Sequence, residues 1–137
     1  MPRGNEYTLD CSLAKETRAR LDPFTFAYIE TAMWTLTLTD EDGGSLDYLG
    51  LWDIAPETID KAIADCREFQ DAHGQLFIGR ESQAGHDFWL TRNRHGAGFW
   101  DGDWPESTAS ILTAAAHAQG EVDWYVGDDE AVYQYQE

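Results

Sequence analysis

The sequence has little lysine, little cysteine and no long apolar run. Lys15 and Lys61 are its only lysines, and 9 basic residues stand against 26 acidic ones, which gives a formal net charge of −17 at pH 7. Such a charge repels nucleic acid and anionic membranes and favours basic partners. Proteins adapted to high salt are also rich in acids and poor in lysine, so the charge by itself does not identify a partner.

Membrane insertion and secretion are not expected. The chain has no apolar run near the roughly 20 residues of a membrane span, and the amino terminus, MPRGNEYTLD, has no hydrophobic segment of a signal peptide. We therefore expect a protein of the cytoplasm. Cys11 and Cys66 are far apart and neither belongs to a CxxC, so we expect neither a zinc knuckle nor a disulfide. Cys66 is predicted to be a small core residue.

The chain has enough apolar material to fold in spite of its charge. Hydrophobic residues make up 42% of it and aromatic residues 13%, which is more than an intrinsically disordered chain carries. A chain of 137 residues has the ordinary size of one domain. We expect a single globular domain over residues 1–137, in which residues 1–21 form an irregular arm or a short helix.

The stretch Gly85–Asp103, GHDFWLTRNRHGAGFWDGD, predicts a β-hairpin. With its turn at residues 94–95, Trp89 would face Trp100 across the ribbon, and both faces of the ribbon would be apolar. Cross-strand pairs of this kind stabilise a sheet by roughly 0.2–1 kcal/mol each. We therefore expect this hairpin to be central and buried, with residues 75–78 as a short strand leading to it.

Three helices and a second hairpin complete the prediction. Each helix begins at a proline. Asp22 can cap the first helix, Glu57 interacts favourably with the dipole of the second, and the last two helices end at glycines. The order is α-α-ββ-α-ββ, which indicates an α+β fold with an antiparallel sheet of about four strands from two hairpins, packed with about three helices. The predicted helices cover residues 22–39, 56–73 and 105–119, and the second hairpin pairs residues 122–126 with residues 131–133.

Three blocks of the sequence resemble a family of small uncharacterised proteins encoded by bacteriophages and prophages. The blocks are FAYIETAMW, GHDFWLTRNRHGAGFWD and GEVDWYVGDDEAVY, and they span most of the chain from Phe26 to Tyr133. The resemblance implies an accessory phage gene expressed in a bacterial cytoplasm, and it transfers no catalytic residue. Glycine is usual in the family at the position of Glu130, which leaves the type of that turn open.

Histidines and aspartates around the first predicted hairpin are candidates for chemistry. The predicted register places His86, Asp101 and Asp103 on one face, so these three are the candidates for a metal site, but no HExxH, HxH or second coordinating segment accompanies them. Asp87 and His95 are expected to stabilise the hairpin mouth and turn. There is no GxSxG and no phosphate-binding glycine motif. We expect no enzyme activity, metal or cofactor; the alternative is a small enzyme or ligand-binding protein that uses His86, Asp87, His95 and Asp101.

The acidic charge gives the main functional hypothesis. Duplex DNA carries one charge per roughly 1.7 Å, so the 17 net charges correspond to about 29 Å of duplex, close to the roughly 37 Å diameter of a compact chain of this length. The hypothesis is a phage accessory protein that inhibits a host nucleic-acid-binding defence or repair factor, of the anti-CRISPR or antirestriction type, through DNA mimicry. It would bind a basic host protein and no nucleic acid, as a monomer or weak dimer; an acidic accessory protein without mimicry is the other alternative. The candidate partner-binding residues are Asp40, Glu41, Asp42, Asp47, Asp53, Asp123, Asp128, Asp129 and Glu130.

Overall fold

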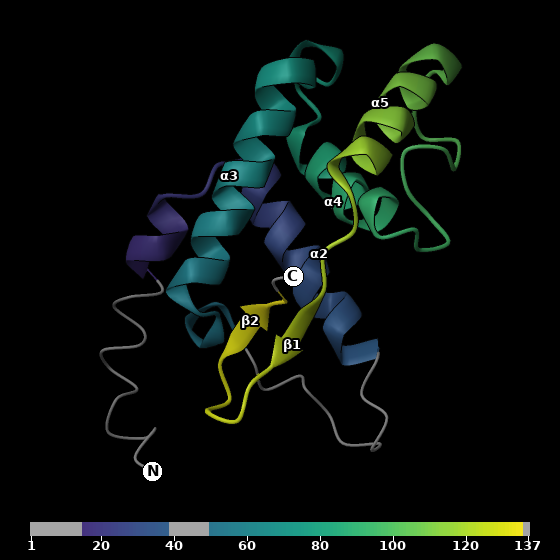
Figure 1. Ribbon diagram of the computed structural model, residues 1–137. Helices are drawn as coiled ribbons and strands as arrows, with labels where there is room; N and C mark the ends of the chain where they lie inside the picture. The colour runs from purple at the N-terminus through teal and green to yellow at the C-terminus, as the bar shows by residue number, and fades with distance from the viewer. Residues whose placement is uncertain (1–14, 39–49, 136–137) are drawn as a thin grey trace.

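The computed structural model describes residues 15–38 and 50–135 (Figure 1). Residues 15–19 are helical, so the end of the predicted arm is a short helix. Over the described ranges, no helix combines the length and the apolarity needed to cross a membrane. The elements are α2 (Pro23–Leu38), the 3-10 helix η1 (Leu51–Asp53), α3 (Pro56–His73), the 3-10 helix η2 (Gly74–Leu76), α4 (Glu81–Arg92), α5 (Glu106–Gln119), β1 (Trp124–Val126) and β2 (Val132–Gln134).

The predicted four-stranded sheet is wrong. The fold is mostly helical, and the described residues contain one sheet of two antiparallel strands, β1 and β2. Instead of a first hairpin, residues 81–92 form α4 and residues 93–105 form turns and irregular backbone. The predicted strand at residues 75–78 is also wrong, because the chain there contains η2 and a turn.

The position of α4 explains why the hairpin prediction failed. This helix lies between α2 and α5 (Figure 1), and every residue from Asp87 to Arg92 is buried. A helix that is covered on several sides has no single apolar stripe, so its sequence lacks the 3.6-residue period. A short, continuous apolar run of this kind fits a buried strand and a buried helix equally well.

Helices α2 and α4 cross at very short distance. A Cβ atom built on Gly85 of α4 would lie 2.0 Å from the carbonyl oxygen of Phe24 in α2, so only glycine fits at the crossing. Aromatic rings pack around this crossing. The ring centroid of Phe88 lies 5.8 Å from that of Phe24 and 4.2 Å from that of Phe69 in α3, on which the Phe88 ring stacks. The ring of Phe99, from the loop after α4, stacks on Phe69 with centroids 5.9 Å apart, so this loop packs against the same core.

The three predicted helices are confirmed, and their buried faces are confirmed in part. Helix α2 begins after Asp22, whose side chain accepts a hydrogen bond of 2.8 Å from the Thr25 amide. In α3 the three- and four-residue spacing predicts a buried stripe, and four of its five side chains are buried while Ile63 is half-buried; the stripe is Ile59, Ala62, Ile63, Cys66 and Phe69. In α5 the spacing predicts that Ile111, Leu112, Ala115 and Ala118 face inward. Leu112 is buried and Ala115 half-buried, but Ala118 is exposed and Ile111 is 48% exposed, so this part of the prediction is wrong.

The second predicted hairpin is confirmed. Trp124 and Val132 point into the core, whereas Tyr125 and Tyr133 stand opposite each other on the outer face. The ribbon is attached to the start of α3, because the Val132 carbonyl accepts hydrogen bonds from the Ala55 amide (2.9 Å) and from the Thr58 hydroxyl (3.1 Å). The turn of the hairpin therefore lies beside the amino-terminal end of α3.

A buried arginine joins α4 to three other parts of the chain. The Arg92 guanidinium donates to the Tyr28 hydroxyl (3.0 Å), to the Asp65 carboxylate (2.9 Å) and to the carbonyls of Gln119 (3.1 Å) and Gly120 (2.7 Å). Burial by itself lowers the pKa of Arg92, but the neighbouring Tyr28 and Asp65 raise it overall. The guanidinium thus pairs with the partly buried Asp65 and satisfies carbonyl groups at the carboxyl end of α5.

Candidate functional site

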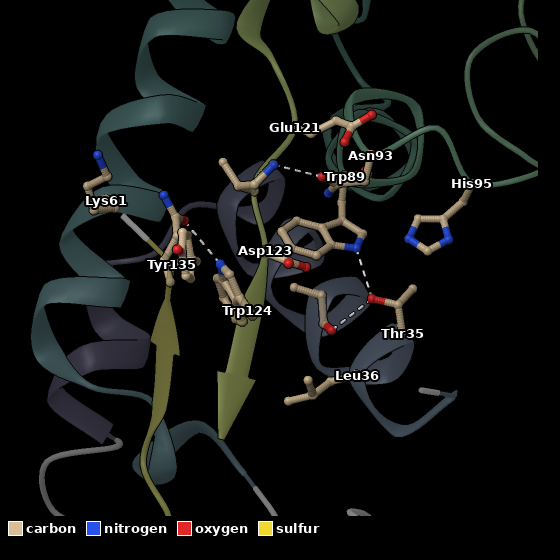
Figure 2. Close-up of a pocket in the computed structure, with 13 residues that line it drawn as sticks. Thr35, Leu36, Lys61, Trp89, Asn93, His95, Glu121, Asp123, Trp124 and Tyr135 are labelled. Atoms are coloured by element: carbon tan, nitrogen blue, oxygen red, sulfur yellow. Dashed lines mark hydrogen bonds between the residues drawn. The ribbon is translucent and has the colours of Figure 1, made fainter. Parts of the chain in front are cut away.

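A pocket lies where the ends of α2 and α4 meet the start of β1. Its volume is about 740 Å³, within the range of roughly 300–1,000 Å³ typical of ligand sites. The indole rings of Trp89 and Trp124 form its inner part, in a T-shaped contact with ring centroids 5.3 Å apart. Figure 2 shows His95, Glu121 and Asp123 arranged around Trp89.

The polar atoms of the inner part are already hydrogen-bonded. The Trp89 indole donates to the Thr35 hydroxyl (2.9 Å), and the Trp124 indole donates to the Gln134 side-chain oxygen (3.1 Å). The Asn93 side chain accepts a hydrogen bond of 2.9 Å from the Val122 amide. The two tryptophans therefore have fixed positions, and both rings are buried, with Trp89 4% and Trp124 6% exposed.

The mouth of the pocket is charged. Glu121 and Asp123 are both exposed, and His95 is half-buried. Arg94 lies just outside, with its Nε 3.7 Å from a carboxylate oxygen of Glu121. Of the described lining residues, Lys61 is the one lysine or arginine, and it stands at the opposite end of the pocket from His95 (Figure 2).

A second group of acidic side chains lies at the hairpin turn, and we call it the acidic tip. It consists of Glu57 in the first turn of α3 and of Asp128, Asp129 and Glu130 in the turn, all exposed. Asp129 organises the turn, since it accepts hydrogen bonds from the Tyr133 hydroxyl (2.6 Å) and from the Ala131 amide (3.1 Å). The bond to Asp129 raises the pKa of Tyr133 to about 12, and the nearby Glu57 carboxylate contributes to the shift.

The structure separates the predicted partner-binding residues. Asp53 is 3% exposed and accepts a hydrogen bond of 2.7 Å from the Gly50 amide, so its carboxylate is not part of an acidic surface. Asp123 lies at the pocket mouth, at the opposite end of β1 from the acidic tip. Of the remaining candidates, Asp128, Asp129 and Glu130 lie together at the tip, and Asp40, Glu41, Asp42 and Asp47 lie outside the described residues.

The candidates from the first predicted hairpin do not form one site. His86 faces α2, where its Nδ1 lies 2.9 Å from the Thr31 hydroxyl. Asp87 is buried and accepts hydrogen bonds from the Trp104 indole (2.7 Å) and from Gln83 (3.0 Å). Burial raises the pKa of Asp87, although these two hydrogen bonds oppose the shift.

The remaining candidates have structural or surface positions. Asp101 accepts a hydrogen bond of 3.2 Å from the Gly98 amide, and Asp103 is exposed. No group of three or more histidines, cysteines, aspartates or glutamates within the described ranges could hold a metal ion. His95 is the one member of the set that lies in the pocket.

Sequence reasoning missed Glu121 and Asn93. Asn93 directly follows α4, and Glu121 follows the glycine that ends α5, so 28 positions separate them. The hydrogen bond between Asn93 and the Val122 amide brings the two segments together. The signal that could have found Glu121 is local, namely two acids at alternate positions beside Trp124 in GEVDWYV.

Comparison of the chain with protein-family models, with curated proteins and with solved structures finds no match.

Proposed function

We propose that the protein is a phage or prophage accessory protein that acts in the bacterial cytoplasm by binding a basic host protein. The partner would be a nucleic-acid-binding defence or repair factor, which this protein would inhibit in the manner of anti-CRISPR or antirestriction proteins. The observation that carries the proposal is the acidic tip, where residues 128–130 expose three consecutive carboxylates and the exposed Glu57 is close enough to Tyr133 to affect its pKa. Such a cluster attracts a positively charged groove and accelerates encounter with it.

The outer face of the hairpin adds aromatic surface beside the acidic tip. Tyr125 is 46% exposed, and its ring centroid lies 5.8 Å from that of Tyr133. Tyrosine is enriched in protein interfaces because it combines a large apolar ring with a polar end. Acids that serve only solubility need no such neighbours, so this combination favours a binding surface.

The described acids support mimicry of DNA charge at two places. The acidic tip is one, and Glu121 with Asp123 at the pocket mouth is the other. Four residues, Trp124 to Gly127, separate Asp123 from Asp128, which corresponds to at most roughly 17 Å at about 3.3 Å per strand residue. A basic groove that normally holds successive phosphates could contact both.

The test is capture of a partner from a host lysate by the tagged protein at low and at high salt. A basic nucleic-acid-binding protein should be retained at low salt and released at high salt, since exposed charges are screened within about 8 Å at physiological ionic strength. Short duplex DNA should displace it. The double variant Asp128→Asn with Glu130→Gln should retain less of it without unfolding, because exposed substitutions usually change stability by less than about 0.5 kcal/mol.

A matched control removes the same charge elsewhere. Asp103→Asn with Glu106→Gln changes two exposed acids, one three residues before α5 and one at its first residue. This variant should leave retention close to that of the unmodified protein. Equal loss in both double variants would show that net charge acts without a defined surface. Retention of no basic partner at either salt concentration would favour an acidic accessory protein without mimicry.

The alternative of a small enzyme built on His86, Asp87, His95 and Asp101 has no common site in the structure. His86 contacts α2, Asp87 is buried beside Trp104, and His95 lies in the pocket.

A further inference from the structure

We propose that the outer edge of β1 receives an extended, basic segment of the host partner as a third strand. The inference rests on the proposed function, and it adds the manner of binding to it. Extended segments bind open sheet edges through main-chain hydrogen bonds, which supply affinity, while alternate side chains supply specificity. The hairpin offers an edge of this kind.

The hydrogen bonds of the hairpin show which way the backbone groups of β1 face. The Asp123 carbonyl accepts a hydrogen bond of 2.7 Å from the Tyr135 amide, and the Gly127 amide donates one of 2.8 Å to the Ala131 carbonyl. In an antiparallel pair, alternate residues direct both their amide and their carbonyl towards the partner strand. The residues whose backbone groups face away from β2 are therefore Val122, Trp124 and Val126.

The outer edge of β2 is covered by the chain itself. The Val132 carbonyl accepts the hydrogen bond of 2.9 Å from the Ala55 amide, and Ile54 forms a parallel bridge with Val132. Helix α3 follows this segment and lies on the β2 side of the ribbon (Figure 1). An added strand would have to displace the segment on this side.

The outer edge of β1 is open over the described residues. The Val122 amide donates to the Asn93 side chain at 2.9 Å. No residue in the ranges 15–38 and 50–135 hydrogen-bonds to the backbone amide or carbonyl groups of Trp124 and Val126. Two donors and two acceptors thus stand in one row, which is the arrangement that pairs with the backbone of another strand.

The residues of this edge favour a strand. Many sheet edges are protected by lysine or proline, and residues 121–127 contain neither. The residues of β1 itself are aromatic or β-branched, as strands prefer. Tyr125 is 46% exposed on the outer face, so its ring can cover an apolar side chain of the added strand.

Acidic side chains stand at both ends of the edge. Glu121 and Asp123 are exposed at its beginning, and Asp128 and Glu130 are exposed beyond its end. They attract a segment that carries cations at both of its ends, and this complementarity selects among extended segments. The occupant is therefore a short β-forming sequence flanked by lysine or arginine.

A second copy of the chain fits this edge less well. If two β1 strands paired antiparallel about Tyr125, Asp123 of each copy would lie next to Asp128 of the other. Two molecules of net charge −17 would also have to approach each other. Like charges suppress such pairing, so the acids that attract a basic segment also keep the copies apart.

Hydrogen exchange of the ¹⁵N-labelled full chain tests the edge directly. In the free protein the amides of Trp124 and Val126 should exchange at least tenfold faster than the amide of Tyr125, because Tyr125 faces β2 and they do not. Saturation with the peptide acetyl-Arg-Lys-Val-Thr-Val-Lys-Arg-amide should bring the three rates close together, since the added strand pairs with the two open amides.

Two control peptides separate backbone pairing from charge. The same peptide with N-methyl groups on its three central residues keeps every charge but has no amide donors in that stretch, and it should bind at least tenfold more weakly. The analogue with glutamate in place of every lysine and arginine keeps the backbone donors, and its charge should prevent measurable binding.

Val126→Pro blocks the edge from the side of the protein. Proline removes an amide that faces away from β2, so the hairpin should persist, and continued protection of the Tyr125 and Gly127 amides would show that it does. The variant should bind the basic peptide about five- to tenfold more weakly. Val126→Thr keeps the amide and the β-branched shape, and it should bind within about twofold of the unmodified protein.

Three results would overturn the inference. Slow exchange of Trp124 and Val126 in the free protein would show that the edge is already covered. Equal binding of the N-methylated peptide, or a persistent difference in rates with the basic peptide bound, would place the contact elsewhere. Full capture of the lysate partner by Val126→Pro would place the partner elsewhere while the proposed function stands. Conversely, protection by the basic peptide without any captured basic protein would contradict the proposed function and leave the edge as a peptide site, so the two failures are distinguishable.

Discussion

Replacing Gly85 with alanine tests the contact on which the helical core depends. In an ordinary helix interior this change stabilises the protein by roughly 0.5–1 kcal/mol. Here the new Cβ would lie 2.0 Å from the Phe24 carbonyl oxygen and 2.8 Å from the carbonyl carbon. Real Cβ atoms almost never approach closer than 3.0 Å, so α2 and α4 would have to separate by about 1 Å.

That separation is costly because the obstacle is backbone. The Phe24 carbonyl cannot rotate out of the way as a side chain could, and Phe24 itself is fully buried with its ring 5.3 Å from that of Phe77. Added volume in a well-packed core costs about 1–3 kcal/mol. We expect Gly85→Ala to lower the free energy of unfolding by about 2–3 kcal/mol, in the direction opposite to its helix propensity.

The assay is urea denaturation followed by tryptophan fluorescence, with the midpoint and slope fitted separately. Gly74→Ala is the matched control, because Gly74 has φ −57° and a Cβ there would meet no atom within 4 Å. It should raise stability by roughly 0.4–1 kcal/mol. If Gly85→Ala is as stable as the unmodified protein, the close crossing of α2 and α4 is refuted.

Four further predictions can be checked with the same equipment. Trp100 is 53% exposed, so Trp100→Ala should cost less than about 1 kcal/mol in urea denaturation, and a loss of 3 kcal/mol or more would put the indole in the core. Burial raises the pKa of Asp87 above its ordinary 3.8, so the native state binds this proton more tightly than the unfolded state. The stability of the unmodified protein relative to Asp87→Asn should therefore increase as pH falls through the raised pKa towards 3.8; a decrease over this window would contradict the buried carboxylate. Glu130 has φ 66°, a left-handed conformation that favours glycine, so Glu130→Gly should exceed the charge-matched Glu130→Gln in stability by up to about 1 kcal/mol, and a less stable glycine variant would argue against the turn. Dialysis against a chelator should leave the melting temperature unchanged, and a drop of many degrees that one divalent ion reverses would reveal a metal site.

Local signals in the sequence predicted the elements that have one buried face. Pro56 at the start of α3 and the stripe that includes Ile59 and Phe69 gave the helix and its orientation. The alternation around Trp124 gave the strand β1. In each case burial on one side leaves a period in the sequence, which is the information that pattern analysis uses.

The central helix and the pocket could not be predicted in this way. Asp87 is polar but buried, because the Trp104 indole and Gln83 donate hydrogen bonds to it. Trp104 lies 17 positions away in the sequence, so no local pattern predicts this contact. Trp89 and Glu121 reach the same pocket from segments 32 positions apart. Asp128, Asp129 and Glu130 were candidates from the sequence of the predicted turn, whereas Glu57 joins them only through the folding of the hairpin onto α3, and the pocket that combines acids with tryptophans exists only through tertiary packing.

The attachment of Arg92 to Gln119 and Gly120, next to the bond between Asn93 and Val122, bears on how the molecule opens and closes. The end of α4 holds the whole connection between α5 and β1, so this connection cannot detach without exposing a guanidinium and an acid, Asp65, that are largely hidden from water. Local opening should then occur in larger cooperative units, with α5 and the hairpin released together instead of one by one. In hydrogen exchange the amide of Val122 would be protected like the core helices, even though it belongs to a connecting segment and lies beside an open pocket.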